Sequence, residues 1–391
     1  MKQAIKCFLV AIAAVFISAN AFAQVTTSSL GGSIVDKNGE PIVGAAVVAT
    51  HVPSGTVYGA AANTAGRYTI QGMRPGGPYK VEISCLGYQT VTITDVTLSL
   101  AESYNISKSL NDDAQMLASA IVVSEAASRF AAEKTGAATN INNEQIINLP
   151  TVSRSISDIT RLSPYGGNGM TFAGADGRTA NFTVDGADFN NNFGLSSNLP
   201  GGGNPISIDA IEEIQVVISP FDVRQTNFIG GGVNAITKSG TNTFKGSAYV
   251  YHRNENMRGD AVYGQEISGA RATDRSTTYG FTLGGPIVKN KLFFFVNGEY
   301  AKSPTIANRW KGSRNGVANS ANYISRTTLS DLQQVSDFVK SKYGYDTGSY
   351  TSFPADENNM KLLARIDWNI NDKHKLALRY NYTLNNKWTA P

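Results

Sequence analysis

Few residues in this sequence have the types and spacings that catalysis or metal binding requires. The three histidines, His51, His252 and His374, are far apart and form no HExxH motif or other zinc-ligand pattern. The glycines at 201–203 precede no Lys-Ser/Thr pair at the start of a helix, so they predict a loop rather than a phosphate cradle. We therefore predict no catalytic residue and no cofactor.

The acidic residues near position 185 come closest to a metal site. Asp185, Asp188 and Asn190 miss the register of a calcium-binding loop and lack its distal glutamate. Asp185 followed by Gly186 is instead typical of a tight turn. We predict no metal site here. A polar loop follows the turn and contains Asp188, Asn190, Asn191, Asn192 and Phe193.

The N-terminal residues have the pattern of a secretory signal peptide. Lys2 and Lys6 form a positive region, residues 7–19 are apolar, and Ala-Phe-Ala at 21–23 fits a cleavage site. The apolar stretch is too short for a membrane-spanning helix. We expect residues 1–23 to be removed, so that the mature protein begins at Gln24.

Charge and cysteine content exclude further classes of function. Without Lys2 and Lys6, the 34 basic and 30 acidic residues become 32 and 30, and no segment carries a Lys/Arg cluster. This balance argues against nucleic-acid binding. The remaining cysteine, Cys85, lies in an apolar run and is expected to be a small buried residue rather than a reactive thiol.

Residues 25–110 show the pattern of a small β-sandwich. Short apolar runs alternate with segments rich in Gly, Pro, Asn and Asp, which supply turn geometry. This spacing favours an all-β fold. The expected strands include 34–35, 46–50, 68–70, 79–83 and 90–93.

Residues 111–136 are predicted to be a linker with one short β-prone run. Such a run can add as a strand to the sheet edge of a partner, because strand addition relies on main-chain hydrogen bonds and demands little of the sequence. An ordinary linker strand explains the run equally well. It consists of Ala120, Ile121, Val122, Val123, Ser124 and Glu125.

Residues 137–240 mix helical and strand patterns, which predicts an α+β domain. Apolar residues keep one face of a helix from Ile156 to Leu162, and the neighbouring Arg154, Asp158 and Arg161 are expected to pair in a buried network. Further along, we expect a helical turn over 205–213, a strand over 214–218, a glycine turn at 230–232 and a strand over 233–237.

From residue 241 onward, apolar and polar residues alternate strictly in five segments. In the fourth, Leu362 and Ile366 belong to one row, and Leu363 and Arg365 to the other. A soluble sheet also alternates. However, long connections (254–276, 302–358) alternate with short ones (289–290, 371–373), as in transmembrane β-barrels. Because five strands cannot close a barrel and an open edge in lipid is costly, we expect a longer protein in which residues 241–391 are the incomplete start of the barrel.

The motifs of the first domain resemble the carboxypeptidase regulatory-like domain. They are GSIVD at 32–36, GEPIVGA at 39–45, NTAGRY at 63–68 and Gly-Tyr at 87–88. The resemblance implies a non-catalytic accessory module, which in large receptors stands in front of a plug domain.

Residues 137–246 resemble the plug domain and first barrel strand of TonB-dependent outer-membrane receptors. The matching motifs are Leu-Pro at 149–150 with Arg-Leu-Ser-Pro at 161–164, Val-Asp-Gly at 184–186, and the helix-strand-turn-strand order of 205–237. The run SPFDVRQTNFIG at 219–230 replaces the DASA-like run of SusC-type receptors and resembles the Oar-like branch.

This resemblance implies a mainly β fold: a β-sandwich accessory domain (25–110), a linker (111–136), an α+β plug (137–240) and the first strands of a transmembrane antiparallel β-barrel of about 22 strands. It makes residues 120–125 the candidate TonB box. It also makes the loop from Asp188 to Phe193 the candidate ligand loop at the plug apex, facing the barrel lumen.

The implied function is TonB-dependent active uptake of a ligand across the outer membrane of a Gram-negative bacterium, without enzymatic activity. The plug and N-terminal domain would be reached from the periplasm. The implied partners are TonB with its inner-membrane energising complex, outer-membrane lipid and the ligand. The departure at 219–230 leaves a SusD-like lipoprotein partner open. The alternative is a surface binding or adhesion protein of the outer membrane without energised transport, which a non-functional TonB box would favour.

Overall fold

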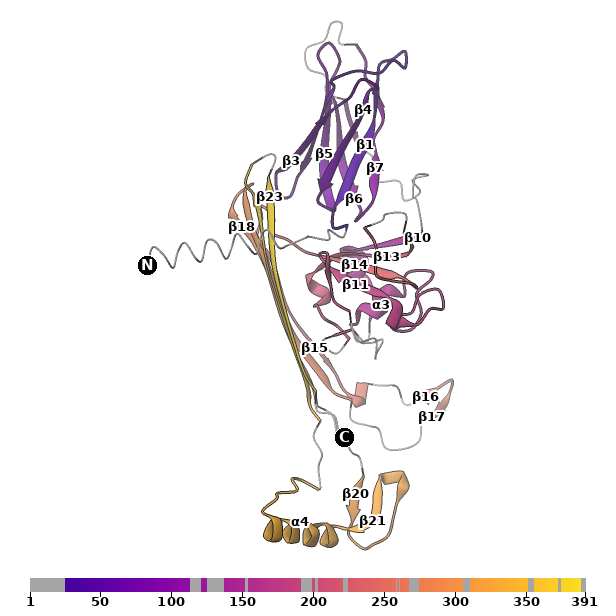
Figure 1. Cartoon of the computed structure of the whole chain (residues 1–391), viewed down its shortest axis with the longest axis vertical. Coiled ribbons are helices and arrows are strands. Elements are labelled where there is room, and N and C mark those ends of the chain that lie inside the picture. The colour runs from indigo at the N-terminus through magenta and orange to yellow at the C-terminus, as the bar shows by residue number, and fades with distance from the viewer. Residues whose placement is uncertain are drawn as a thin grey trace, which may run out of the picture.

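A computed structural model describes residues 25–387 of the chain apart from several short segments. Three sheet-built bodies follow one another along it (Figure 1). Within the described residues, no helix has both the length and the apolar character that crossing a membrane requires. The segments outside the description are 113–120, 125–136, 152–153, 191–198, 201–202, 221–223, 258, 260, 267–273, 305–309, 351–354 and 372–373.

The first body, called the sandwich below, consists of two packed sheets. One sheet has the order β4-β1-β7, with β8 also paired to β1, and the other has the order β3-β2-β5-β6-β9. The two sheets enclose one apolar core. The strands are β1 (Ser28–Val35), β2 (Ala46–His51), β3 (Thr56–Ala61), β4 (Arg67–Met73), β5 (Gly76–Ser84), β6 (Val91–Leu98), β7 (Ser103–Asn105), β8 (Lys108–Ser109) and β9 (Ile121–Ser124).

Side chains of the turn segments hold the hairpins of the sandwich. The Asp36 carboxylate accepts hydrogen bonds from two backbone N–H groups of its own turn, both at 2.8 Å. The side-chain oxygen of Asn63 likewise accepts two backbone N–H groups, at 2.9 and 3.0 Å, in the turn before β4. Such bonds preset turn geometry, which explains why the sequence pattern located these turns. Cys85 is a free thiol that packs half-buried against the core, so the expectation of a buried cysteine holds only in part.

The second body, called the plug below, is an α+β unit built on a five-stranded sheet of order β10-β13-β14-β11-β12. The expected strands near 214–218 and 233–237 are present as β13 and β14. The helical turn expected over 205–213 was mostly wrong, because only Ile208–Ala210 (η2) is a 3-10 helix and residues 211–213 already belong to β13. The elements are β10 (Ala137–Asn142), α2 (Asn143–Asn148), α3 (Ile156–Thr160), η1 (Gly177–Thr179), β11 (Asn181–Val184), β12 (Ala187–Asp188), β13 (Ile211–Ser219) and β14 (Gly232–Thr237).

Within the described residues, the contacts of the three charged residues near α3 differ from the buried network that was expected. Arg154 pairs with Asp209 instead. Asp158 accepts the N–H of Ser155 in the capping box that starts α3. Arg161 donates to the side chain of Asn168. The helix also ends at Thr160, which leaves Leu162 exposed beyond it.

The third body, called the wall below, is one long antiparallel sheet of order β15-β18-β19-β22-β23. Its five strands and their alternation of long and short connections agree with the sequence prediction. The longest connection carries its own small elements at the far end of the wall (Figure 1). The wall strands are β15 (Lys245–Arg253), β18 (Ser276–Val288), β19 (Leu292–Ser303), β22 (Glu357–Asn369) and β23 (Lys375–Lys387). The connections contain η3 (Glu255–Met257), β16 (Ala261–Val262), β17 (Gln265–Glu266), β20 (Lys311–Ser313), η4 (Ser320–Asn322), β21 (Ile324–Thr328) and α4 (Leu329–Tyr343).

The two faces of the wall separate as the alternation predicted. On β22, Leu363 and Arg365 are 2% and 8% exposed and lie against the plug. Leu362 and Ile366 on the other face are 40% and 42% exposed. The exposed row is apolar, as expected for a surface that meets lipid.

The sandwich lies at the end of the wall that carries the short turns (Figure 1). The backbone N–H of Asn242 bonds to the carbonyl of Pro53 at 2.8 Å. Asn369 donates to the Thr56 hydroxyl at 2.9 Å. The loop between β2 and β3 therefore contacts the plug-to-wall connection, and the first residue of β3 contacts the wall.

Candidate functional site

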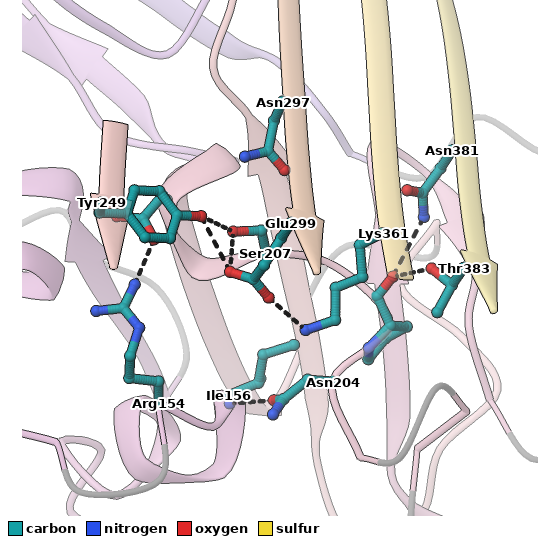
Figure 2. Close-up of polar contacts among 12 residues, drawn as sticks. Arg154, Ile156, Asn204, Ser207, Tyr249, Asn297, Glu299, Lys361, Asn381 and Thr383 are labelled. Carbon is teal, nitrogen blue, oxygen red and sulfur yellow. Dashed lines mark hydrogen bonds and ion pairs between the residues drawn. The ribbon is translucent and has the colours of Figure 1, made fainter. Parts of the chain in front are cut away.

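A buried polar cluster joins the plug to three strands of the wall. Glu299 of β19 lies opposite Lys361 of β22, and their side chains form an ion pair at 2.8 Å with only 8% and 9% exposure. The other carboxylate oxygen accepts the hydroxyls of Ser207 from the plug at 2.8 Å and of Tyr249 from β15 at 3.0 Å. Figure 2 shows this arrangement, which we call the Glu299 cluster. Every oxygen of the carboxylate has a partner, as a buried charge requires.

Further contacts extend the Glu299 cluster along the plug. The Pro205 carbonyl accepts a hydrogen bond from the Thr383 hydroxyl on β23 at 2.6 Å. On the other side, the Arg154 guanidinium lies 3.8 Å from the ring centre of Tyr251 on β15, a cation–π contact. The same guanidinium forms the ion pair with Asp209. The plug is thus held to the wall here largely by polar side chains.

A second polar cluster forms around Asp185 of the plug. The Asp185 carboxylate accepts the backbone N–H of Thr237 at 3.0 Å and its hydroxyl at 2.6 Å. Arg365 of β22 donates to the Thr237 carbonyl at 2.6 Å and to the Asp367 carboxylate at 2.8 Å. Arg379 of β23 forms an ion pair with Asp185 at 3.3 Å. We call these residues the Asp185 cluster.

The turn chemistry predicted from the sequence explains where Asp185 lies. Thr183 faces Asp188 and Val184 faces Ala187, so Asp185 and Gly186 are the two central residues of a hairpin. Asp185 has a φ of 51°, a left-handed conformation that Asp tolerates better than most residues. The tight turn directs its carboxylate toward the end of β14 and the wall.

A third polar contact joins the sandwich to the plug. Glu213 of β13 accepts the backbone N–H of Leu100 and the side-chain amide of Asn140, both at 3.0 Å. The Leu100 carbonyl in turn accepts the side-chain amide of Gln215 at 2.8 Å. Leu100 is fully buried and Glu213 is 5% exposed. We call this contact the Glu213 junction.

Burial controls the ionisation of Glu213. Loss of water around the carboxyl group raises its pKa to about 7, and the hydrogen bond from Leu100 only partly offsets this effect. The group therefore changes charge near neutral pH at the boundary between two folded bodies.

Glu213→Gln should remove a pH dependence from the stability of the protein. Because the folded-state pKa lies above the unfolded value, the protonated carboxyl stabilises the fold at low pH, and this contribution disappears as pH rises through 7. Between pH 5 and pH 8 the free energy of unfolding of the wild type should fall by about 2–3 kcal/mol, whereas that of the variant should not change. Urea unfolding of both proteins in lipid at the two pH values measures the difference.

Glutamine keeps the acceptor for the Leu100 N–H, so the variant should match the wild type at pH 5. A stability difference that stayed constant from pH 5 to pH 8 would show that Glu213 does not titrate in this range.

The candidate TonB box lies partly within the described residues. Ile121–Ser124 form β9, whose backbone pairs with β6 of the sandwich, whereas Ala120 and Glu125 lie outside the description. The β-strand expected for this run is therefore present. Contact with TonB stays a prediction.

The candidate ligand loop is described only at its start. Asp188 ends β12 and is exposed. Asn190 accepts the N–H of Phe182 at 2.7 Å and donates to the Asn181 side chain, so it holds the loop to the plug sheet. Asn191, Asn192 and Phe193 lie outside the described residues. Ligand contact by this loop stays a prediction, and the side chain of Asn190 already has a structural role.

The histidine at position 51 belongs to a core rather than to a reactive site. His51 shares a hydrogen bond of 2.7 Å with the Ser54 hydroxyl, and burial lowers its pKa to about 3. It borders a cavity of about 530 Å³ between the sandwich, the plug and β15, which Arg74 and Lys238 also line. Among the described residues no group of three or more His, Cys, Asp and Glu side chains is placed to hold a metal ion.

Sequence reasoning missed the partners that make these clusters. It placed Arg365 in the row of the wall opposite Leu362 and Ile366, but it did not connect Glu299 with Lys361, nor Glu213 with the sandwich. The only sequence signal was a charged residue within an otherwise alternating strand. The partner of such a charged residue depends on the register between two strands that a long connection separates in the sequence.

Two known domain families match the chain. The carboxypeptidase regulatory-like domain matches residues 29–111, and an outer membrane beta barrel domain matches residues 236–311. They correspond to the sandwich and to the start of the wall.

The comparisons also include a curated relative and solved structures. The chain is 24% identical over 383 residues to the TonB-dependent transporter Oar of Myxococcus xanthus. The aligned region covers 93% of this chain and 34% of Oar. It thus spans about a third of the length of that relative. The siderophore receptor PirA from Acinetobacter baumannii is 21% identical, with a TM-score of 0.41 over 64% of this chain and 32% of that chain. The outer membrane transporter YddB from Escherichia coli is 14% identical, with a TM-score of 0.42 over 64% and 33%.

Proposed function

We propose that this chain, an Oar-like TonB-dependent receptor of the Gram-negative outer membrane, takes part in active uptake of a ligand across that membrane. The two domain matches and the likeness to Oar support the assignment. The curated relative Oar is named as a transporter. The proposed activity therefore involves binding and movement, without a covalent step.

The observation that carries the proposal is the polar attachment of the plug to the wall. The Glu299 and Asp185 clusters bind plug to wall through ion pairs and hydrogen bonds. Water can replace such bonds when the plug moves, whereas a wholly apolar interface would expose its surface to water at a cost proportional to area. Apolar contacts also exist, because Phe295 and Leu363 of the wall belong to the plug core. This polar attachment supports a plug that moves relative to the wall.

In the proposed mechanism, a ligand binds from the extracellular side, where the loop from Asp188 to Phe193 is the candidate contact. TonB, driven by its inner-membrane complex, binds the box at residues 120–125 by strand addition and pulls on the plug. Displacement of the plug opens the lumen to the periplasm. The apolar outer row of the wall contacts outer-membrane lipid.

Val122→Pro in the full-length receptor should abolish energised uptake. Proline removes a backbone donor and fixes φ, which weakens strand addition to TonB. The ligand can be detected without prior identification, by comparing the solutes that cells expressing wild type and variant deplete from rich medium. We expect depletion by the wild type that is at least tenfold slower in Val122→Pro and that a protonophore stops.

Val122→Thr is the matched control, because threonine keeps the N–H and a β-branched side chain. It should deplete medium at the wild-type rate. Uptake by Val122→Pro at the wild-type rate would mean that the TonB box lies elsewhere in the chain. Ligand binding with no protonophore-sensitive depletion in any variant would favour a binding or adhesion protein instead.

A further inference from the structure

The segment Ile121–Ser124 (β9) adds to the sandwich as an outermost strand. It pairs in parallel with β6, in a register that sets Val91 opposite Ile121 and Thr94 opposite Ser124. In the described part of the chain, the sheet has the order β3-β2-β5-β6-β9, so β6 would be an edge strand without this segment. An edge strand accepts a new strand readily, because its N–H and C=O groups on that side lack partners.

The edge of β6 accommodates only a short partner. The pairing begins at Val91, the first residue of β6, and ends at Thr94. The next residue, Asp95, has a φ of 62°, which interrupts the extended backbone. The usable edge is therefore four residues long, the same length as β9.

The chain is also anchored beside this edge. Asp112 forms a β-bridge with Tyr88, three residues before β6 begins, and an ion pair with Lys37 at 2.5 Å. Only residues 113–120 separate Asp112 from Ile121. Such a short connection gives the segment a high effective concentration at the edge of β6.

We propose that the outer edge of β6 is a binding surface that holds Ile121–Ser124 and withholds it from TonB. The inference rests on the proposed function, in which this segment belongs to the TonB box. While Ile121–Ser124 is docked, part of its backbone groups already bond to β6 and are not open to a second partner. Once released, it can pair over the whole run 120–125. The sandwich and TonB therefore compete for one strand.

This competition makes the affinity for TonB depend on the released fraction. If the docked form dominates, the apparent dissociation constant rises in inverse proportion to the fraction of receptor in which the segment is free. A signal that loosens the sandwich from β9 would strengthen TonB binding without changing the box itself.

A disulfide between the two strands tests the proposal. Thr94→Cys and Ser124→Cys place two cysteines at paired positions with small changes in volume, in a Cys85→Ser background that prevents other pairing. The full-length receptor in detergent is oxidised, and its binding to the purified periplasmic domain of TonB is measured by fluorescence anisotropy. The same sample is then measured after reduction. Thr94→Cys with Cys85→Ser, oxidised in parallel, is the matched control.

We expect the disulfide to form, the oxidised double variant to bind the TonB domain at least tenfold more weakly, and reduction to restore the affinity to that of the control. Heat-modifiable gel mobility shows whether the receptor is folded. If the cysteines do not pair in a folded receptor, the docking of β9 onto β6 is wrong. Equal affinity of the oxidised and reduced forms would overturn the competition while leaving the proposed function intact. If even the control does not bind the TonB domain, the proposed function fails, and this inference fails with it.

Discussion

Lys361→Met should lower the free energy of unfolding of the protein by about 3–5 kcal/mol, because it leaves the Glu299 carboxylate buried without its cation. Ser207 and Tyr249 would still donate to one carboxylate oxygen. Neutral hydroxyls do not replace a positive charge in a site this deeply buried. The midpoint of urea unfolding, followed by tryptophan fluorescence, measures the change.

The double variant Glu299→Gln with Lys361→Met is the decisive comparison. It removes both charges and keeps an acceptor for the Ser207 and Tyr249 hydroxyls. Replacing a buried ion pair as a whole is often close to neutral, so the double variant should recover most of the loss. If single and double variants lost the same stability, Glu299 and Lys361 would not be energetically coupled.

Asp185→Ala, in the Asp185 cluster, should lower the free energy of unfolding by a similar amount, about 3–5 kcal/mol. The substitution leaves the Arg379 charge without its plug partner and the Thr237 N–H without its acceptor. Arg365 is less affected, because Asp367 binds it directly at 2.8 Å. Urea unfolding in lipid gives the total loss. Hydrogen exchange of the Thr237 amide shows whether the end of β14 has separated from the turn.

Two further variants separate charge from hydrogen bonding at this position. Asp185→Asn keeps an acceptor for Thr237 and tolerates the left-handed φ, so it should lose less stability than Asp185→Ala and keep the Thr237 amide protected. Adding Arg379→Leu to Asp185→Ala removes the unpaired charge and should restore part of the loss. A full wild-type stability in Asp185→Ala alone would mean that the cluster contributes nothing to holding the plug.

The carboxypeptidase regulatory-like domain, the start of an outer membrane beta barrel domain and the mainly β fold were predicted correctly, because they depend on local patterns. Alternation along β22 separated Leu363 and Arg365 from Leu362 and Ile366 without any knowledge of neighbouring strands. The turn at Asp185 was likewise visible, since Asp-Gly has a local conformational preference. These predictions required no long-range register.

The functional contacts could not be predicted in the same way. Glu299 meets Lys361 only because β19 and β22 pair in one register across a connection of more than fifty residues. Glu213 appeared to belong to a helical turn, and its burial depends on how the sandwich docks onto β13. The pairing of β9 with β6 uses main-chain groups, which leave no side-chain signature in the sequence.

The parallel direction of β6 and β9 determines how the docked strand responds to force. β6 ends at Leu98, two residues before the Leu100 contact with the plug, so both strands run toward the plug. Tension transmitted from the plug through the chain after Ser124 acts along the strand and loads all the inter-strand hydrogen bonds together, in shear. A partner that pulls the segment sideways from the sheet breaks the inter-strand hydrogen bonds one after another. The same four residues therefore resist movement of the plug and yield to a lateral pull.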